Sequence, residues 1–162
     1  MARRYGWAAS NERCNGEVPR NWGTNVSVLT TLTIDGLDVE NTIYFEGSLN
    51  RSIFEHYLVE ILGPHLVEGE IIILDNLSAH LSEKVEQALA NKGCKLLYLP
   101  AYSPDLSPIE LAFAKVKEYL RSVGARTSEA LAQGLEQALS SITPAEALAF
   151  FKHCGYTVLA QS

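Results

Sequence analysis

This chain of 162 residues has few cysteines and no long apolar run. Its three cysteines, Cys14, Cys94 and Cys154, lie far apart and form no CxxC or Cys/His pattern. That spacing argues against a zinc site or a disulfide framework, and it predicts reduced thiols in a cytoplasmic protein. No apolar stretch approaches the roughly 18–20 residues that cross a bilayer. The first residues, MARRYGWAAS, lack the apolar segment of a signal peptide, so no membrane partner is expected.

The common catalytic motifs are also missing. The chain has no GxSxG nucleophile motif, no P-loop and no GxGxxG, and nothing near Cys94 suggests an activated thiolate. It has no internal repeat and no low-complexity linker. Its composition, 47% hydrophobic and 20% charged, is typical of one globular domain.

The net charge of −6 argues weakly against a nucleic-acid partner, but the charge is unevenly distributed. Arginines outnumber acids within residues 1–22, and lysines and arginines outnumber acids within residues 111–126. Local basic patches matter more for phosphate contact than the overall charge. A solvated surface explains each patch equally well when it is taken alone. The DNA-binding candidates are Arg3, Arg4, Arg20, Lys117 and Arg121.

Hydrophobic periodicity predicts the element order β-β-α-β-α-β-α-α-α. The expected strands cover residues 26–34, 39–45, 70–74 and 95–99, and the expected helices cover 51–62, 82–91, 107–123, 128–141 and 144–153. Antiparallel strands followed by βαβ units predict an α/β fold, a mixed sheet flanked by helices. The expected organisation is a single domain over residues 1–162. It divides into an irregular arm (1–23), a core (24–126) and carboxyl-terminal helices (127–162).

Asp75 is the first candidate site residue, because it ends the continuous apolar run Ile71–Leu74. Such a run is typical of a buried central strand, and ligands of open α/β sheets bind at the carboxyl ends of the strands. An Asx turn at Asp75-Asn76 that merely ends the strand is an equally good interpretation of this residue alone.

Glu110 is the second candidate, and it has a simpler alternative role. Ser107-Pro108-Ile109-Glu110 fits a capping box with proline at the first helical position, so Glu110 alone is better explained as a helix cap. A metal ligand is compatible with the same place, since the helix dipole keeps a carboxylate ionised there. Viewed down the helix axis, Lys117 and Arg121 point within about 20° of the direction of Glu110. This arrangement suits a groove for a phosphate backbone, and it suits an ordinary charged surface as well.

Two further segments are interpreted as supports for such a site. His80 follows Asp75 by five residues and is expected to pack beside the site with Asn76 instead of binding metal. The turn at Tyr102-Ser103-Pro104 is expected to deliver the chain into the Glu110 helix without taking part in chemistry.

These motifs together resemble a known family. LDNLSAH followed by YLPAYSPDLSPIELAFAKVK, with 34 residues between Asp75 and Glu110, resembles the catalytic domain of mariner-superfamily DDE transposases, in their bacterial insertion-sequence branch. The resemblance also covers the arm, RRYGWA and VPRNWGTNVSVLTTLTIDGL. It implies a ribonuclease-H-like fold, with Asp75 and Glu110 as two of three catalytic carboxylates lying near one another. It further implies two Mg²⁺ or Mn²⁺ ions, DNA cleavage and strand transfer, with transposon ends and target DNA as partners. A homodimer is one candidate assembly, and the sequence leaves the oligomeric state open.

The chain departs from that family pattern in three places. Ser107 stands where the family more often has Asn, and Phe113 where it often has Trp; both are expected to keep the roles of cap and apolar anchor. The family's first catalytic Asp lies on a strand before the arm, and neither Asp35 nor Asp38 replaces it, because both sit in the hairpin turn. We therefore expect the first strand and the upstream helix-turn-helix to be missing, which would explain the acidic net charge.

The expected consequence is an incomplete two-metal site with little or no activity. An upstream transposase fragment that supplies the Asp is one candidate partner. Two other hypotheses remain open: a non-catalytic remnant that binds DNA or a transposase, and an independent metal-dependent nuclease that uses Asp75 and Glu110 alone.

Overall fold

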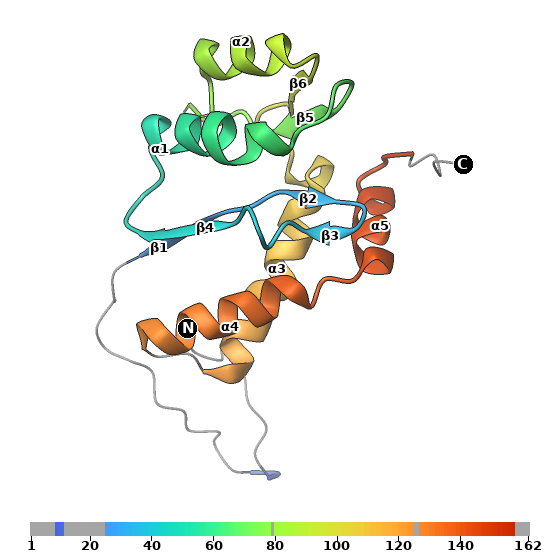
Figure 1. Ribbon diagram of the computed structural model, residues 1–162. Coiled ribbons are helices and arrows are strands. Elements are labelled where there is room, and N and C mark those ends of the chain that lie inside the picture. Colours follow the sequence, from blue (N-terminus) through green and yellow to red (C-terminus); the bar gives the residue numbers. More distant parts are fainter. Residues whose placement is uncertain (1–8, 12–24, 79, 125–126, 158–162) are drawn as a thin grey trace.

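The structure is a computed structural model that describes residues 9–11, 25–78, 80–124 and 127–157 (Figure 1). Its strands are β1 (Val26–Leu29), β2 (Leu32–Thr33), β3 (Gly36–Leu37), β4 (Ile43–Glu46), β5 (Ile71–Leu74) and β6 (Lys95–Tyr98). Its α-helices are α1 (Arg51–His56), α2 (Glu83–Asn91), α3 (Pro108–Val123), α4 (Ser128–Ser140) and α5 (Pro144–His153). A π-helix (Tyr57–Leu62) and a 3₁₀ turn (Gly63–His65) extend α1, and another 3₁₀ turn (Pro104–Leu106) precedes α3. Within these described ranges no helix is long and apolar enough to cross a membrane.

The described strands form three two-stranded sheets. β1 pairs antiparallel with β4, β2 pairs antiparallel with β3, and β5 pairs parallel with β6. The predicted strand 26–34 is interrupted between β1 and β2, and the predicted strand 39–45 begins only at Ile43. Thr30 leaves the ladder, and its hydroxyl donates to the carbonyl oxygen of Asp38 at 3.1 Å. The predicted hairpin is present, but its turn lies one residue earlier than Asp35-Gly36: Ile34 and Asp35 form the turn, and Gly36 begins β3 opposite Thr33. Glycine is required at 36 because a Cβ at its φ of +126° would meet the Ile142 carbonyl oxygen at 2.8 Å.

The expectation that β5 is a central strand is wrong for the described residues, where β5 has a single strand neighbour, β6. Its apolar run is explained by helices instead. Ile72 is buried in a cluster with Phe54, Leu58 and Val85 from α1, the π-helix and α2, while Ile71 is 59% exposed. A continuous apolar run indicates that a strand is buried, but it does not indicate how many strands flank it.

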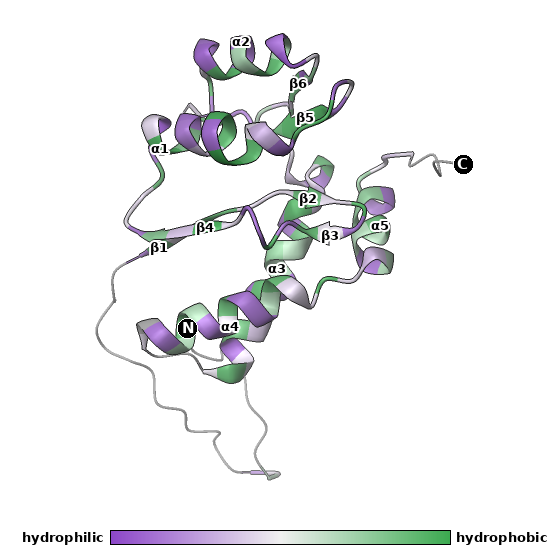
Figure 2. Cartoon of the chain, viewed as in Figure 1, coloured by the Kyte–Doolittle hydropathy of each residue, from purple (hydrophilic) through white to green (hydrophobic). Residues whose placement is uncertain are grey.

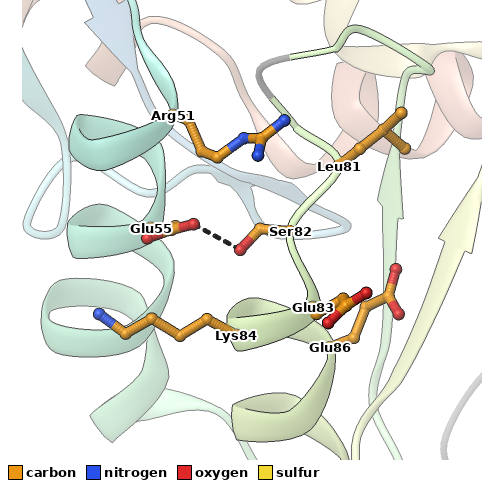
Figure 3. Close-up of a pocket in the computed structure, with 7 residues that line it drawn as sticks. All are labelled: Arg51, Glu55, Leu81, Ser82, Glu83, Lys84 and Glu86. Atoms are coloured by element: carbon orange, nitrogen blue, oxygen red, sulfur yellow. Dashed lines mark hydrogen bonds between the residues drawn. The ribbon is translucent and has the colours of Figure 1, made fainter.

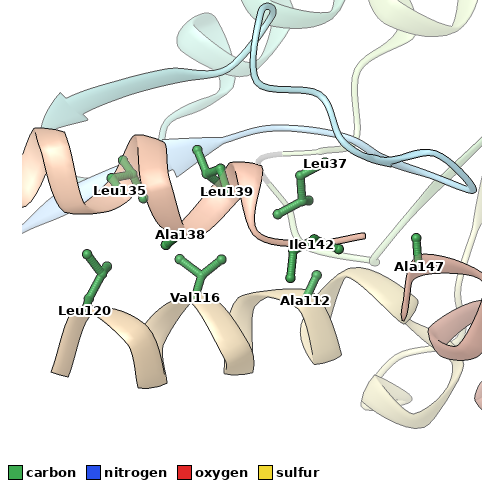
Figure 4. Close-up of a cluster of buried hydrophobic side chains, with 9 residues drawn as sticks. All are labelled: Leu37, Ala112, Val116, Leu120, Leu135, Ala138, Leu139, Ile142 and Ala147. Atoms are coloured by element: carbon green, nitrogen blue, oxygen red, sulfur yellow. The ribbon is translucent and has the colours of Figure 1, made fainter. Parts of the chain in front are cut away.

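A second hydrophobic cluster joins α3, α4 and α5 beneath the β2–β3 hairpin (Figures 2 and 4). Its side chains are Leu37, Ala112, Val116, Leu120, Leu135, Ala138, Leu139, Ile142 and Ala147. The buried stripe of α3 therefore runs through Ala112, Val116 and Leu120. Phe113 is only partly buried and Val123 is 48% exposed, so these two apolar side chains lie at the margins of the stripe.

Side chains at the helix ends complete this packing. The hydroxyls of Ser82 and Thr143 accept hydrogen bonds from the first turns of α2 and α5, and Thr143 with Glu146 forms the predicted capping box. The Lys115 Nζ donates to Glu146 Oε1 at 2.6 Å and to the Ser141 carbonyl oxygen at 3.0 Å. Lys115 therefore joins α3 to α5, and its charge is already partnered.

The ion pair between Lys115 and Glu146 predicts an acid-sensitive step in stability. The Lys115 hydrogen bond, with those from Thr143, lowers the pKa of Glu146 from its ordinary value near 4.5 to about 2. Because the folded-state pKa is depressed, this stabilisation is present above pH 4.5 and is lost as the pH falls towards 2. Urea unfolding should show Glu146→Gln losing less stability than the parent across that range. Glu136→Gln, an exposed change on α4, should follow the parent, and identical curves for all three proteins would contradict the assignment.

Candidate active site

The site lies at the edge where the parallel strands β5 and β6 both end. The Leu99 amide donates to the Leu74 carbonyl oxygen at 2.8 Å, so the pairing holds up to the last residue before Asp75. From β6 the chain runs through the Pro104–Leu106 turn into α3, whose first turn carries Glu110 (Figure 1). Carboxyl ends of parallel strands are where α/β folds place ligands.

Asp75 presents a half-exposed carboxylate, and its side chain is 46% exposed. Its Oδ1 is hydrogen-bonded to Nδ1 of His80, and because a carboxylate only accepts, we assign the proton to that nitrogen. No backbone amide of the described residues donates to Asp75, so the Asx-turn interpretation is wrong. Its second oxygen, Oδ2, has no hydrogen bond within the described segments and is available to a ligand.

His80 is held against Asp75 by the end of α1. Its ring stacks on Phe54 with centroids 4.2 Å apart and planes at 25°, and Phe54 is 3% exposed. The Tyr98 hydroxyl donates to the His80 carbonyl oxygen at 3.3 Å. Nε2 of His80 is buried and has no partner among the described residues. His80 is therefore fixed by packing on one side and by Asp75 on the other.

A pocket of about 440 Å³ lies beside the loop that carries these residues (Figure 3). It is lined by Arg51, Glu55, Leu81, Ser82, Glu83, Lys84 and Glu86. Ser82 donates to Glu55 Oε1 at 2.6 Å, and Arg51 donates to the Ser78 carbonyl oxygen at 3.4 Å. Sequence reasoning missed Arg51 and Glu55. Their spacing of four residues places them on one face of a helix, but it does not reveal that each contacts a residue 27 positions later in the chain.

Glu110 lies exposed in the first turn of α3. The capping-box interpretation is wrong, because the Ser107 hydroxyl makes no cap hydrogen bond and only its carbonyl oxygen accepts from the Glu110 amide, at 3.1 Å. The Glu110 carboxylate has no hydrogen bond or ion pair in the described part of the chain. Glu146 at the equivalent place in α5 is fully engaged. Glu110 is therefore a free carboxylate near the positive end of a helix.

The other predicted site residues are only partly located. Lys117 is exposed and Arg121 partly exposed on α3, and neither forms an ion pair with a described residue. Asn76 is exposed beside Asp75. Arg3, Arg4 and Arg20 lie outside the described residues.

The donor chemistry at this edge suits Mg²⁺ or Mn²⁺, which take hard oxygen ligands. Asp75 and Glu110 each offer at least one free carboxylate oxygen. Across residues 9–11, 25–78, 80–124 and 127–157, however, no three His, Cys, Asp or Glu side chains gather into a metal-binding group. That the two carboxylates share one metal cluster stays a prediction, which Mn²⁺-induced NMR broadening at both residues would check.

Free carboxylates at a strand end and at a helix start suit the two-metal chemistry by which enzymes cleave phosphodiesters. The chain belongs to the DDE superfamily endonucleases, whose family model matches residues 1–132. The resemblance to DDE transposases is thereby confirmed, while the bacterial branch stays a prediction. No curated protein matches the chain.

Solved structures support the same fold. The Mos1 strand transfer complex aligns with a TM-score of 0.67 and 15% identity, over 98% of this chain and 51% of that chain. The Mos1 mariner paired end complex with Mn aligns with a TM-score of 0.63 and 14% identity, over 95% and 47%. At such identities the likeness shows the ribonuclease-H-like fold alone. The chain spans about half the length of these Mos1 chains.

The stack of Phe54 on His80 predicts a localised effect of Phe54→Leu. Loss of the aromatic face should move the NMR signals of the His80 ring protons downfield, speed amide exchange in residues 75–82, and lower the unfolding free energy by about 1 kcal/mol. Phe113→Leu, another aromatic change on a helix, should leave the His80 signals in place. Unchanged His80 signals in Phe54→Leu would show that the stack is not formed in solution.

Proposed function

We propose that this chain carries part of the catalytic site for DNA transposition by DDE-type phosphodiester cleavage and strand transfer. The observation that carries the proposal is the pair of free carboxylates, Asp75 and Glu110, both inside the residues matched by the DDE family model. A strand end and a helix start present them, which are the two places where a fold holds acidic side chains rigid and charged.

In this proposal Asp75 and Glu110 are the metal ligands and catalytic residues. Bound Mg²⁺ or Mn²⁺ ions supply activation of the attacking oxygen and stabilisation of the leaving oxygen. His80 orients the Asp75 carboxylate through its Nδ1–H, and Asn76 supports the same loop. Lys117 and Arg121 supply free positive charge on α3 for the phosphates of transposon ends and target DNA.

A third carboxylate must complete this site. The described residues contain no group of three metal-ligating side chains, so we propose that the missing acid comes from outside them. The resemblance assigns it to a strand ahead of the arm, which an upstream transposase fragment would supply. We further propose that assembly takes place in the cytoplasm.

The same observation favours one alternative function. The described residues carry two free carboxylates and free cations but no complete metal group, which also suits a non-catalytic remnant that binds DNA or a transposase partner. Activity measurements distinguish this alternative.

We expect the purified chain neither to cleave nor to join DNA with Mg²⁺ or Mn²⁺, because a site charge of −2 binds two dications weakly. Fusion of an upstream strand bearing Asp should restore metal-dependent cleavage, and Asp75→Ala or Glu110→Ala should abolish it. Glu136→Ala, on the exposed face of α4, should not. Gel assays on labelled transposon-end DNA measure all of these. Cleavage by the unmodified chain would support an independent nuclease, and failure of the fusion would favour the remnant.

We expect DNA binding to be weak and strongly salt-dependent. Each phosphate contact contributes about 0.9 to the slope of log K against log salt, so Lys117→Gln and Arg121→Gln should each reduce that slope by about 0.9. Lys92→Gln, at the end of α2, serves as the control and should leave the slope unchanged. Fluorescence anisotropy at a series of salt concentrations measures it. Equal slopes for all variants would remove α3 from the proposed DNA surface.

A further inference from the structure

Tyr102 is the most exposed aromatic side chain among the described residues, at 102% of its reference area. Its hydroxyl has no hydrogen bond and its ring has no aromatic neighbour within those residues. Tyr98, four residues earlier, differs: its hydroxyl bonds to Glu86 Oε1 at 3.1 Å and to the His80 carbonyl oxygen. The ring of Tyr102 therefore makes no buried contact with the rest of the described chain.

Tyr102 is also held in a strained conformation, with φ of +58°. A residue with a Cβ is disfavoured in this left-handed region, and such strain persists only where the surroundings impose it. Here Pro100 and Pro104 bracket the turn, and the Ser103 hydroxyl donates to the Ala101 carbonyl oxygen at 3.4 Å. The turn is therefore fixed in shape, and it presents the ring to solvent at a conformational cost.

The following segment is anchored as well. The Tyr156 hydroxyl donates to the Leu106 carbonyl oxygen at 2.7 Å, tying the 3₁₀ turn after Tyr102 to the residues that follow α5. The Leu106 amide donates to the Ser103 carbonyl oxygen at 3.2 Å. The turn that carries the Tyr102 ring is therefore held in place by hydrogen bonds of the residues on either side of it.

The position of Tyr102 relates it to the candidate active site. The residue follows the end of β6, and β6 ends at the same edge of the parallel pair as β5, which delivers Asp75. The same connection then starts α3, which carries Glu110 in its first turn. Tyr102 therefore lies in the connection that runs from the sheet edge near Asp75 to the start of the helix that carries Glu110.

We propose that Tyr102 is a stacking platform for an unpaired nucleobase beside the phosphate that Asp75 and Glu110 address. The inference rests on the proposed DNA function and deepens it, since it names an unstacked base as the recognised group. Every base has a π-face, and an exposed aromatic ring on a fixed support binds such a face without sequence preference. Sequence reasoning assigned this turn to positioning alone; the exposure and the strain of Tyr102 point to direct contact.

The test uses the whole 162-residue chain and a single-stranded oligonucleotide of about twelve nucleotides with one 2-aminopurine, at low salt. Tyr102→Ala should weaken binding about tenfold and abolish the quenching of 2-aminopurine fluorescence seen with the parent chain. Tyr102→Phe and Tyr102→Trp should retain both. Tyr102→Gly should weaken binding as Ala does while its Tm stays equal or rises, because glycine relieves the strain. Tyr44→Ala, at a tyrosine that is 56% exposed on β4, should bind normally.

Each contrary outcome has a defined meaning. Normal binding by Tyr102→Ala, together with weaker binding by Lys117→Gln, would overturn the stacking role and leave the proposed DNA function standing. Equal losses in Tyr102→Phe and Tyr102→Ala would replace stacking by a hydroxyl contact and overturn the inference. A lower Tm in Tyr102→Gly would show that the residue is structural. No DNA binding by the parent chain would overturn both the inference and the DNA function on which it rests.

Discussion

The parallel pairing of β5 with β6 is the constraint on which the candidate site depends. It sends two separate connections out of the same sheet edge: one carries Asp75 and His80, the other carries Tyr102 and leads to Glu110. The Leu99 amide donates to the Leu74 carbonyl oxygen, so the two strands remain paired up to the point where each connection begins. Helices α1 and α2 then cover the pair and supply its apolar contacts, so the edge itself remains open.

The loop after β5 shows how a polar site is supported by an apolar core. Asp75 is half exposed, yet the ring that contacts it stacks on Phe54, which is buried among the helices. Arg51 and Glu55, from the same helix, hold the next residues of the loop. An ordered acidic side chain at the surface is thus positioned by contacts that are mostly in the interior, as preorganised sites require.

Glu110 and Glu146 show how similar local sequences come to differ. Each is the third residue of a helix that begins with proline, after a Thr or Ser cap position. The Glu146 carboxylate accepts hydrogen bonds from the Thr143 amide at the start of its own helix and from Lys115 Nζ. The Glu110 carboxylate makes neither kind of contact. The Ser107 hydroxyl forms no cap hydrogen bond, and no cation among the described residues pairs with Glu110. Of the two carboxylates, the one that makes no contact within the described fold is therefore that of Glu110.

The sequence by itself determined most of the local structure. Periodicity and turn signals located the helices and the hairpin turn within a residue or two, because each depends on neighbours within four residues. Spacing and motif similarity singled out Asp75, Glu110 and His80. Tertiary structure alone decided what depends on distant contacts. Such contacts left β5 with a single strand neighbour among the described residues and paired Lys115 with Glu146. They also left the Ser107 hydroxyl without a cap hydrogen bond and stacked Phe54 on the His80 ring. Tertiary structure also left Tyr102 exposed, because no short-range pattern records which side chains the rest of the chain fails to cover.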